Sequence, residues 1–89
     1  MNYELHTMGE AMTVDEALRW IADLFEEPVE NIKPSTPKGH IGAWDSLGTL
    51  TLMAKLDEEL NIQLQESDID NLKTVEDILR IMKENGKLM

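Results

Sequence analysis

Cysteine is absent from the 89-residue sequence, and aromatic and basic side chains are scarce. The lack of cysteine excludes disulfide scaffolds, thiol catalysis and cysteine-based zinc sites. Eight lysine and arginine residues stand against eighteen aspartate and glutamate residues, which gives a net charge of −10. We expect such a chain to bind neither nucleic acid, which requires neutralisation of phosphates, nor anionic membrane surfaces. An acidic surface suits a partner with a basic patch instead.

We expect neither a membrane span nor a signal peptide in this sequence. No run approaches the roughly 20 apolar residues that cross a bilayer. Residues 1–12 contain acids but no lysine or arginine, so they lack the basic start of a signal peptide. We therefore expect a cytoplasmic protein. Apolar and charged contents of 42% and 29% predict a folded domain over residues 13–89, preceded by a flexible extension over residues 1–12.

The first helix is predicted directly after that extension. Thr13 and Glu16 have the spacing of a capping box. An apolar face with helical periodicity follows, made of Val14, Ala17, Leu18, Ile21 and Phe25. Because proline cannot continue a helix, Pro28 predicts an end at Glu26 or Glu27.

A long connection, residues 28–44, leads to the second helix. It contains all three prolines, and loops of this length are commonly functional. Three apolar side chains are expected to attach it to the core: Val29, Ile32 and Ile41. Trp44 is interpreted as a further packing anchor, and Asp45 as the N-cap of a second helix that ends at Asn61.

Two more helical segments complete the chain. Residues 66–71 predict about one turn, and the spacing of Thr74 and Asp77 predicts the start of a last helix that ends at Gly86. No segment has a convincing strand pattern. The predicted fold is therefore all-α: a small bundle of three main helices plus a short helix in third position, with a long loop between helices one and two.

The second helix contains more apolar residues than one buried face requires. Leucines 52, 56 and 60 share one side with Met53, whereas Leu47, Leu50 and Ala54 lie on a neighbouring side. The pattern fits either a wide buried arc or an exposed docking patch. Six acids and no basic residue occur from position 57 to position 70, which favours the docking patch.

Ser46 lies in the first turn of the second helix and has two interpretations. One is helix capping. The other is covalent modification, because free N–H groups and the positive dipole end favour a phosphate there. A catalytic nucleophile is rejected, because serine needs a base and a group that orients it. The two histidines, His6 and His40, lie in the predicted extension and loop with no such third group in evidence.

The segment Asp45-Ser46-Leu47 is followed by apolar residues and acids at helical spacing. These residues are Leu50, Leu52, Met53, Leu56, Glu58 and Glu59. Together they resemble the phosphopantetheine attachment motif of acyl carrier proteins. The resemblance continues through Leu60-Asn61-Ile62, residues 68–72 and Thr74-Val75, and thus covers residues 13–85. A bare Asp-Ser-Leu tripeptide is weak evidence, but helix spacing, chain length and acidity make the combination specific.

The resemblance implies a carrier that itself catalyses nothing. Ser46 would accept 4′-phosphopantetheine from coenzyme A, and Asp45 would assist the phosphopantetheinyl transferase through its magnesium ion. The thiol of this arm would hold an acyl group as a thioester for acyl-loading and acyl-transfer enzymes with basic docking patches. The partner-binding residues are predicted to be Leu47, Leu50, Ala54, Asp57 and Glu58. No resident metal is implied, and we expect a monomer.

The sequence departs from the pattern of this family in the first turns of the second helix. Many carriers of fatty-acid synthesis have acids where this chain has Gly48 and Thr51, and Lys55 adds a positive charge. We therefore expect weak docking to the general fatty-acid enzymes. The form Trp44-Asp45-Ser46-Leu47 resembles stand-alone carriers of specialised pathways, which suggests a dedicated carrier for an unusual acyl or aminoacyl group.

Two other functions stay open on the sequence alone. An aminoacyl or peptidyl carrier would share the fold and the arm, and an acidic helical interaction module without any arm would share the composition. An EF-hand is excluded, because no segment has its alternating oxygen ligands, central glycine and closing glutamate. Weak binding of divalent cations to the acidic face is nevertheless expected, because it would relieve charge repulsion.

Overall fold

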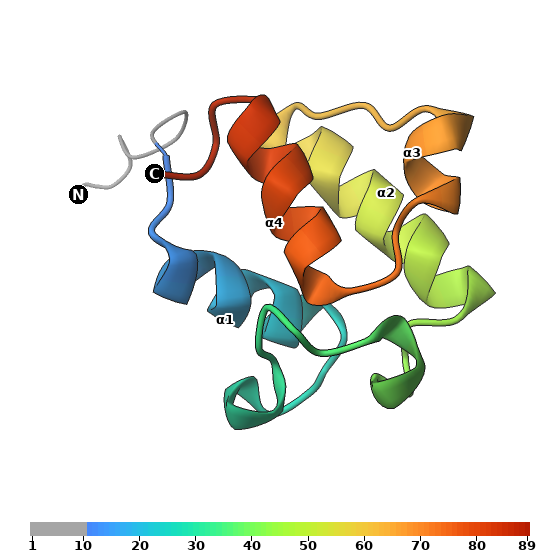
Figure 1. Ribbon diagram of the computed structural model, residues 1–89. Helices are drawn as coiled ribbons and strands as arrows, with labels where there is room; N and C mark the ends of the chain where they lie inside the picture. The colour runs from blue at the N-terminus through green and yellow to red at the C-terminus, as the bar shows by residue number, and fades with distance from the viewer. Residues whose placement is uncertain (1–10) are drawn as a thin grey trace.

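Four α-helices form the bundle in the computed structural model (Figure 1), which describes residues 11–89. They are α1 (Val14–Leu24), α2 (Ser46–Leu60), α3 (Glu66–Asp70) and α4 (Val75–Glu84). Within the described residues, extended pairing is limited to two isolated bridges, Met12 with Leu88 and Pro37 with Thr74. The all-α prediction, with its short helix in third position, is confirmed. His6 and most of the predicted flexible extension lie outside the described residues.

The start of α1 follows from its sequence. The Glu16 N–H donates to Thr13 Oγ1 at 3.1 Å, and the Thr13 N–H donates to Glu16 Oε1 at 2.9 Å, which completes the predicted capping box. Ala17, Ile21 and Phe25 are buried as expected, but Val14 is 41% exposed. The expectation for Val14 was wrong because this side chain borders an open hollow with Leu79 and Leu88 instead of the closed core.

The end of α1 comes two residues earlier than Pro28 alone predicts. Glu26 adopts a left-handed conformation with φ of 54°. The Glu26 N–H donates to the Asp23 carbonyl, and the Glu27 N–H donates to the Ala22 carbonyl at 2.8 Å. This is a Schellman motif, which stops the helix before the proline is reached. α4 ends in the same motif with Gly86 at the left-handed position, as predicted.

The core is mainly aliphatic, with Phe25 and Trp44 as its aromatic members, and it draws on every long helix. Seven of its side chains have no exposed surface: Ala17, Ile21, Leu52, Leu56, Val75, Ile78 and Met82. Partly buried side chains, among them Trp20, Leu60 and Leu64, pack against this cluster. Because the long helices all contribute, α2 is held in one orientation and presents a defined face to solvent.

The long loop is attached to α4 by its backbone as well as by its side chains. The Val75 N–H donates to the Thr36 carbonyl at 3.0 Å, and the Glu76 N–H donates to the Pro34 carbonyl at 2.8 Å. Ile32 and Ile41 are buried as predicted, but Val29 is 43% exposed in the short 3-10 helix η2 (Val29–Asn31). Val29 fails as an anchor because it lines an open surface hollow beside α1.

A second 3-10 helix, η3 (Lys38–His40), lies near the end of this loop, and His40 is exposed there. The loop, teal to green in Figure 1, runs below the helices from α1 to the start of α2. Among the described helices, none combines the length and the apolar character needed to traverse a bilayer.

Candidate functional site

The first turn of α2 holds the residues that the sequence singled out. Asp45 is the N-cap, and its Oδ1 accepts from the Gly48 N–H at 2.9 Å. The next position, Ser46, is exposed and begins the helix. Among residues 11–89, neither the Ser46 N–H nor the Leu47 N–H has an acceptor. These two donors and the helix dipole favour an anion bonded to the Ser46 hydroxyl.

The backbone ahead of Ser46 lies directly against α2. A Cβ atom placed on Gly48 would overlap the carbonyl oxygen of Ala43 and approach Phe25 Cε1 at 3.4 Å. Glycine at this position therefore permits a close contact between loop and helix. The family pattern has an acidic residue at this position, but its Cβ atom would overlap the Ala43 carbonyl oxygen in this backbone arrangement. This overlap gives a physical reason why the chain has glycine there.

Trp44 attaches the backbone before Ser46 to the hydrophobic core. It is only 3% exposed and stacks on Phe25 with ring centroids 5.3 Å apart and an interplanar angle of 22°. Lys38 Nζ lies 5.9 Å from the centroid of the indole ring. The interpretation of Trp44 as a packing anchor is confirmed. Its packing keeps the backbone before Ser46 in place while the serine itself stays accessible.

These features fit the covalent attachment of a phosphodiester. The Ser46 hydroxyl is accessible, the helix that it opens has 15 residues, and free backbone donors lie beside it. The attachment residue also needs access for a modifying enzyme. No large side chain obstructs it from the preceding residues, because Gly42 and Ala43 are small and exposed.

An apolar patch lies next to Ser46 on the outer surface of α2. Leu47 is 74% exposed and Leu50 is 60% exposed, and Ala54 is exposed one turn further on. Asp57 and Glu58 are exposed beyond them. The wide buried arc that the sequence also permitted is therefore wrong for this side of α2, because the buried residues of the helix are Gly48, Thr49, Leu52 and Leu56. Partner binding by these five residues stays a prediction.

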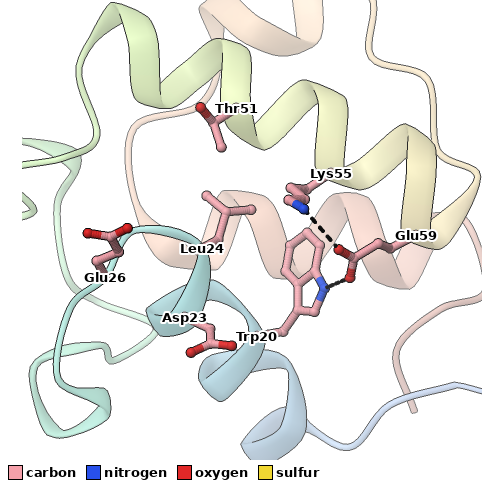
Figure 2. A pocket seen from close by; sticks show the side chains of 7 residues that line it. All are labelled: Trp20, Asp23, Leu24, Glu26, Thr51, Lys55 and Glu59. Carbon is pink, nitrogen blue, oxygen red and sulfur yellow. Dashed lines mark hydrogen bonds and ion pairs between the residues drawn. The ribbon is translucent and has the colours of Figure 1, made fainter.

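The α1 side of α2 carries polar residues that sequence reasoning missed. The Trp20 Nε1–H donates to Glu59 Oε1 at 2.9 Å, and Lys55 Nζ lies 3.5 Å from Glu59 Oε2. Figure 2 shows these side chains around a surface pocket of about 370 Å³ between the two helices. The i,i+4 spacing of Lys55 and Glu59 was a visible signal for the ion pair. No short sequence pattern indicated that the Trp20 side chain would reach from α1 to Glu59 on α2.

The acidic residues do not converge on a metal site in the described part of the chain. There, no group of three histidine, aspartate or glutamate side chains lies close enough to hold an ion. The weak binding of divalent cations expected from the net charge stays a prediction.

Comparison with known families gives one result that bears on this site. The model of the family described as "Phosphopantetheine attachment site" matches residues 15–82, which is well over half of the chain. The matched range contains all of α2 and α3 and the whole first turn described above. No solved structure matches the chain.

Proposed function

We propose that Ser46 is the attachment residue of this chain. The chain belongs to the phosphopantetheine attachment-site family. It is thus a carrier protein with a covalently bound 4′-phosphopantetheine. The observation that carries this proposal is the exposed hydroxyl in the first turn of α2, beside two free backbone donors. Carrier domains of this family are generally not catalytic. The chain is accordingly a substrate of other enzymes.

The attachment reaction transfers the 4′-phosphopantetheinyl group of coenzyme A to Ser46. The serine oxygen bonds to phosphorus, the phosphoanhydride bond of coenzyme A breaks, and adenosine 3′,5′-bisphosphate leaves. The serine proton passes to a base of the transferase. Asp45 uses Oδ1 to cap Gly48, and because Asp45 is exposed its second oxygen is accessible to the magnesium ion of the transferase. When bound, the arm supplies a thiol that holds cargo as a thioester.

The docking surface for partner enzymes is proposed to be the apolar patch of Leu47, Leu50 and Ala54. Exposed leucines surrounded by polar residues are typical of the centre of a protein interface. Asp57 and Glu58 lie beyond this patch and complement a basic patch on the partner. We propose that the carrier acts as a monomer in the cytoplasm.

The cargo is proposed to be an unusual acyl group of fatty-acid-like or specialised biosynthesis, with an aminoacyl or peptidyl group as the alternative. The support is the low charge of the first turns of α2, where Gly48 and Thr51 stand in place of acids and Lys55 is positive. Enzymes of general fatty-acid synthesis would meet fewer negative charges there. The alternative of an armless interaction module does not agree with the family.

Intact mass spectrometry tests the attachment residue. The full chain is co-expressed with a phosphopantetheinyl transferase, alongside Ser46→Ala and the matched control Ser67→Ala, which changes an exposed serine of α3. We expect a mass gain of one phosphopantetheine in the parent and in Ser67→Ala, and none in Ser46→Ala. A gain that persists in Ser46→Ala would place the arm on another residue.

Loading and reconstitution assays test the cargo. The arm-bearing chain is offered to a panel of acyl and aminoacyl ligases, and the thioester products are identified by mass. A dedicated carrier should be loaded by few of them and should support ordinary fatty-acid elongation poorly. Elongation as fast as with a general fatty-acid carrier would contradict the proposed specialisation.

A further inference from the structure

Two neighbouring surface hollows, each of about 370 Å³, lie between α1 and α2. The first begins beside the attachment residue and is lined there by Ala43, Asp45, Leu47 and Gly48. The second ends at Trp20, Lys55 and Glu59. Leu24, Glu26 and Thr51 line both hollows, so the two hollows are neighbours along these residues. We call this feature the α1–α2 furrow.

The α2 wall of the furrow is a single stripe of the helix. Leu47, Thr51, Lys55 and Glu59 follow one another at intervals of four residues, so they share one face. The nine residue steps from Ser46 to Lys55 correspond to about 13.5 Å along the helix axis. The phosphopantetheine arm has roughly thirteen bonds from phosphorus to sulfur and, at extended-peptide dimensions, spans about 15 Å. The arm is therefore long enough to reach Lys55 from Ser46.

The chemistry of the furrow matches an uncharged limb that carries amides and methyl groups. Leu24 and the ring of Trp20 offer apolar surface along the α1 side. The Thr51 hydroxyl donates to the Leu47 carbonyl at 3.1 Å, so its oxygen can accept a hydrogen bond from an amide N–H. Asp23, Glu26 and Glu59 add carboxylate oxygens to this lining, and these oxygens can accept hydrogen bonds from the amide N–H groups of the arm.

The far end of the furrow is held in place before anything binds. The Glu59 carboxylate accepts from the Trp20 indole and pairs with Lys55, and it thereby joins α1 to α2 (Figure 2). A preformed wall lowers the entropic cost of binding a flexible ligand. An arm fixed by its phosphate at Ser46 also binds intramolecularly, at a high effective concentration.

We propose that the α1–α2 furrow holds the phosphopantetheine arm, which folds back from Ser46 along α2 and places its thiol beside Trp20 and Lys55. This inference rests on the proposed attachment at Ser46. The furrow runs on the α1 side of Leu47, so an arm seated there leaves Leu50 and Ala54 free for a partner enzyme.

The absence of cysteine makes a direct test possible, because the thiol of the arm is then the only thiol in the protein. A methanethiosulfonate nitroxide is attached to it in the full arm-bearing chain. Paramagnetic broadening of the two indole N–H signals is then measured by NMR. We expect the Trp20 signal to broaden several-fold more than the Trp44 signal. We also expect the unlabelled arm to shift the Trp20 signal relative to the chain without the arm.

Two variants control for the route of the arm. Thr51→Arg places a long side chain across the middle of the furrow and should remove the selective broadening of Trp20. Ser67→Arg, at an exposed position of α3 outside the furrow, should leave it intact. An unchanged Trp44 signal in both variants shows that the core is still folded.

Different results would contradict the position of the arm in the furrow and its attachment at Ser46. Equal broadening of Trp20 and Trp44, or strongest broadening of buried residues such as Leu52, would overturn the furrow as the seat of the arm and leave attachment at Ser46 standing. A chain that takes up no label and shows no mass gain with the transferase would overturn the attachment itself, and the furrow proposal with it.

Discussion

Helices α2 and α4 use their apolar residues in different ways. All five apolar side chains of α4 are buried: Val75, Ile78, Leu79, Ile81 and Met82. In α2 only two of the leucines are buried, whereas Leu47 and Leu50 are 74% and 60% exposed. α4 therefore stabilises the bundle, and α2 combines a narrower structural face with an exposed apolar surface.

The two helices also differ in whether the N–H groups of their first turns are hydrogen-bonded. The first N–H groups of α4 are used by the loop, since Val75 and Glu76 donate to the carbonyls of Thr36 and Pro34. Within the described residues, the Ser46 and Leu47 N–H groups at the start of α2 have no acceptor. The comparison shows that a helix N-terminus is available for a phosphate only where the rest of the chain leaves its donors free. Four substitutions test this contrast.

The largest loss of stability is expected in the core face of α4. Ile78→Ala removes a fully buried side chain and should lower the free energy of unfolding by about 2–5 kcal/mol, from lost burial and the cavity left behind. Urea denaturation followed by circular dichroism measures this. A loss below about 1 kcal/mol would mean that α4 is not the main structural helix.

A smaller loss is expected at the start of α2. Gly48→Ala improves helix propensity by about 1 kcal/mol but forces a Cβ into the Ala43 carbonyl, and such overpacking typically costs about 1–3 kcal/mol. We expect net destabilisation of about 1 kcal/mol. The matched control is Gly39→Ala, where a Cβ would meet no atom within 4 Å. Equal stabilities of the two variants would show that the loop–helix contact is unimportant.

The third test concerns the cap of α4 and its dependence on pH. Burial by itself would raise the pKa of Asp77, but hydrogen bonds from the Lys73 and Thr74 N–H groups and the nearby Arg80 outweigh it and lower the pKa. A carboxylate with a lowered folded-state pKa stabilises the fold above its unfolded-state pKa. That contribution is lost as the pH falls through the folded-state value.

Asp77→Asn keeps an acceptor oxygen but removes the charge, so it should lower the free energy of unfolding by about 1 kcal/mol at neutral pH, the difference between charged and neutral hydrogen bonds. The difference from the parent chain should disappear at acidic pH. Thermal unfolding at a series of pH values measures it, with the exposed Asp70→Asn as control. A difference that is unchanged or larger in acid would contradict the assignment.

The smallest effect on stability is expected on the exposed side of α2. Leu50→Ala should change the free energy of unfolding by less than about 0.5 kcal/mol, because its side chain is already in water. The same substitution should weaken binding to a loading enzyme, measured by calorimetry. A stability loss as large as that of Ile78→Ala would remove the contrast between the two helices.

Local sequence signals predicted the helical elements and the place of Ser46 at the start of α2. The caps at Thr13, Asp45 and Thr74 were correct because a cap involves residues only three positions apart, so its physics is contained in the sequence. The same holds for Gly86 and for the place of Ser46 at the start of a helix. The family likeness depends on these local patterns as well.

Only the tertiary structure decided which apolar side chains are covered and which surfaces are hollow. Val14 and Val29 fit apolar patterns, yet they border open hollows, because no other element among residues 11–89 packs over them. The contact of Ala43 with Gly48 and the bond from Trp20 to Glu59 join segments that no local pattern relates. The sequence by itself determined where helices begin and which serine opens α2, since those interactions span a few residues. The α1–α2 furrow exists only because packing brings two distant helices together.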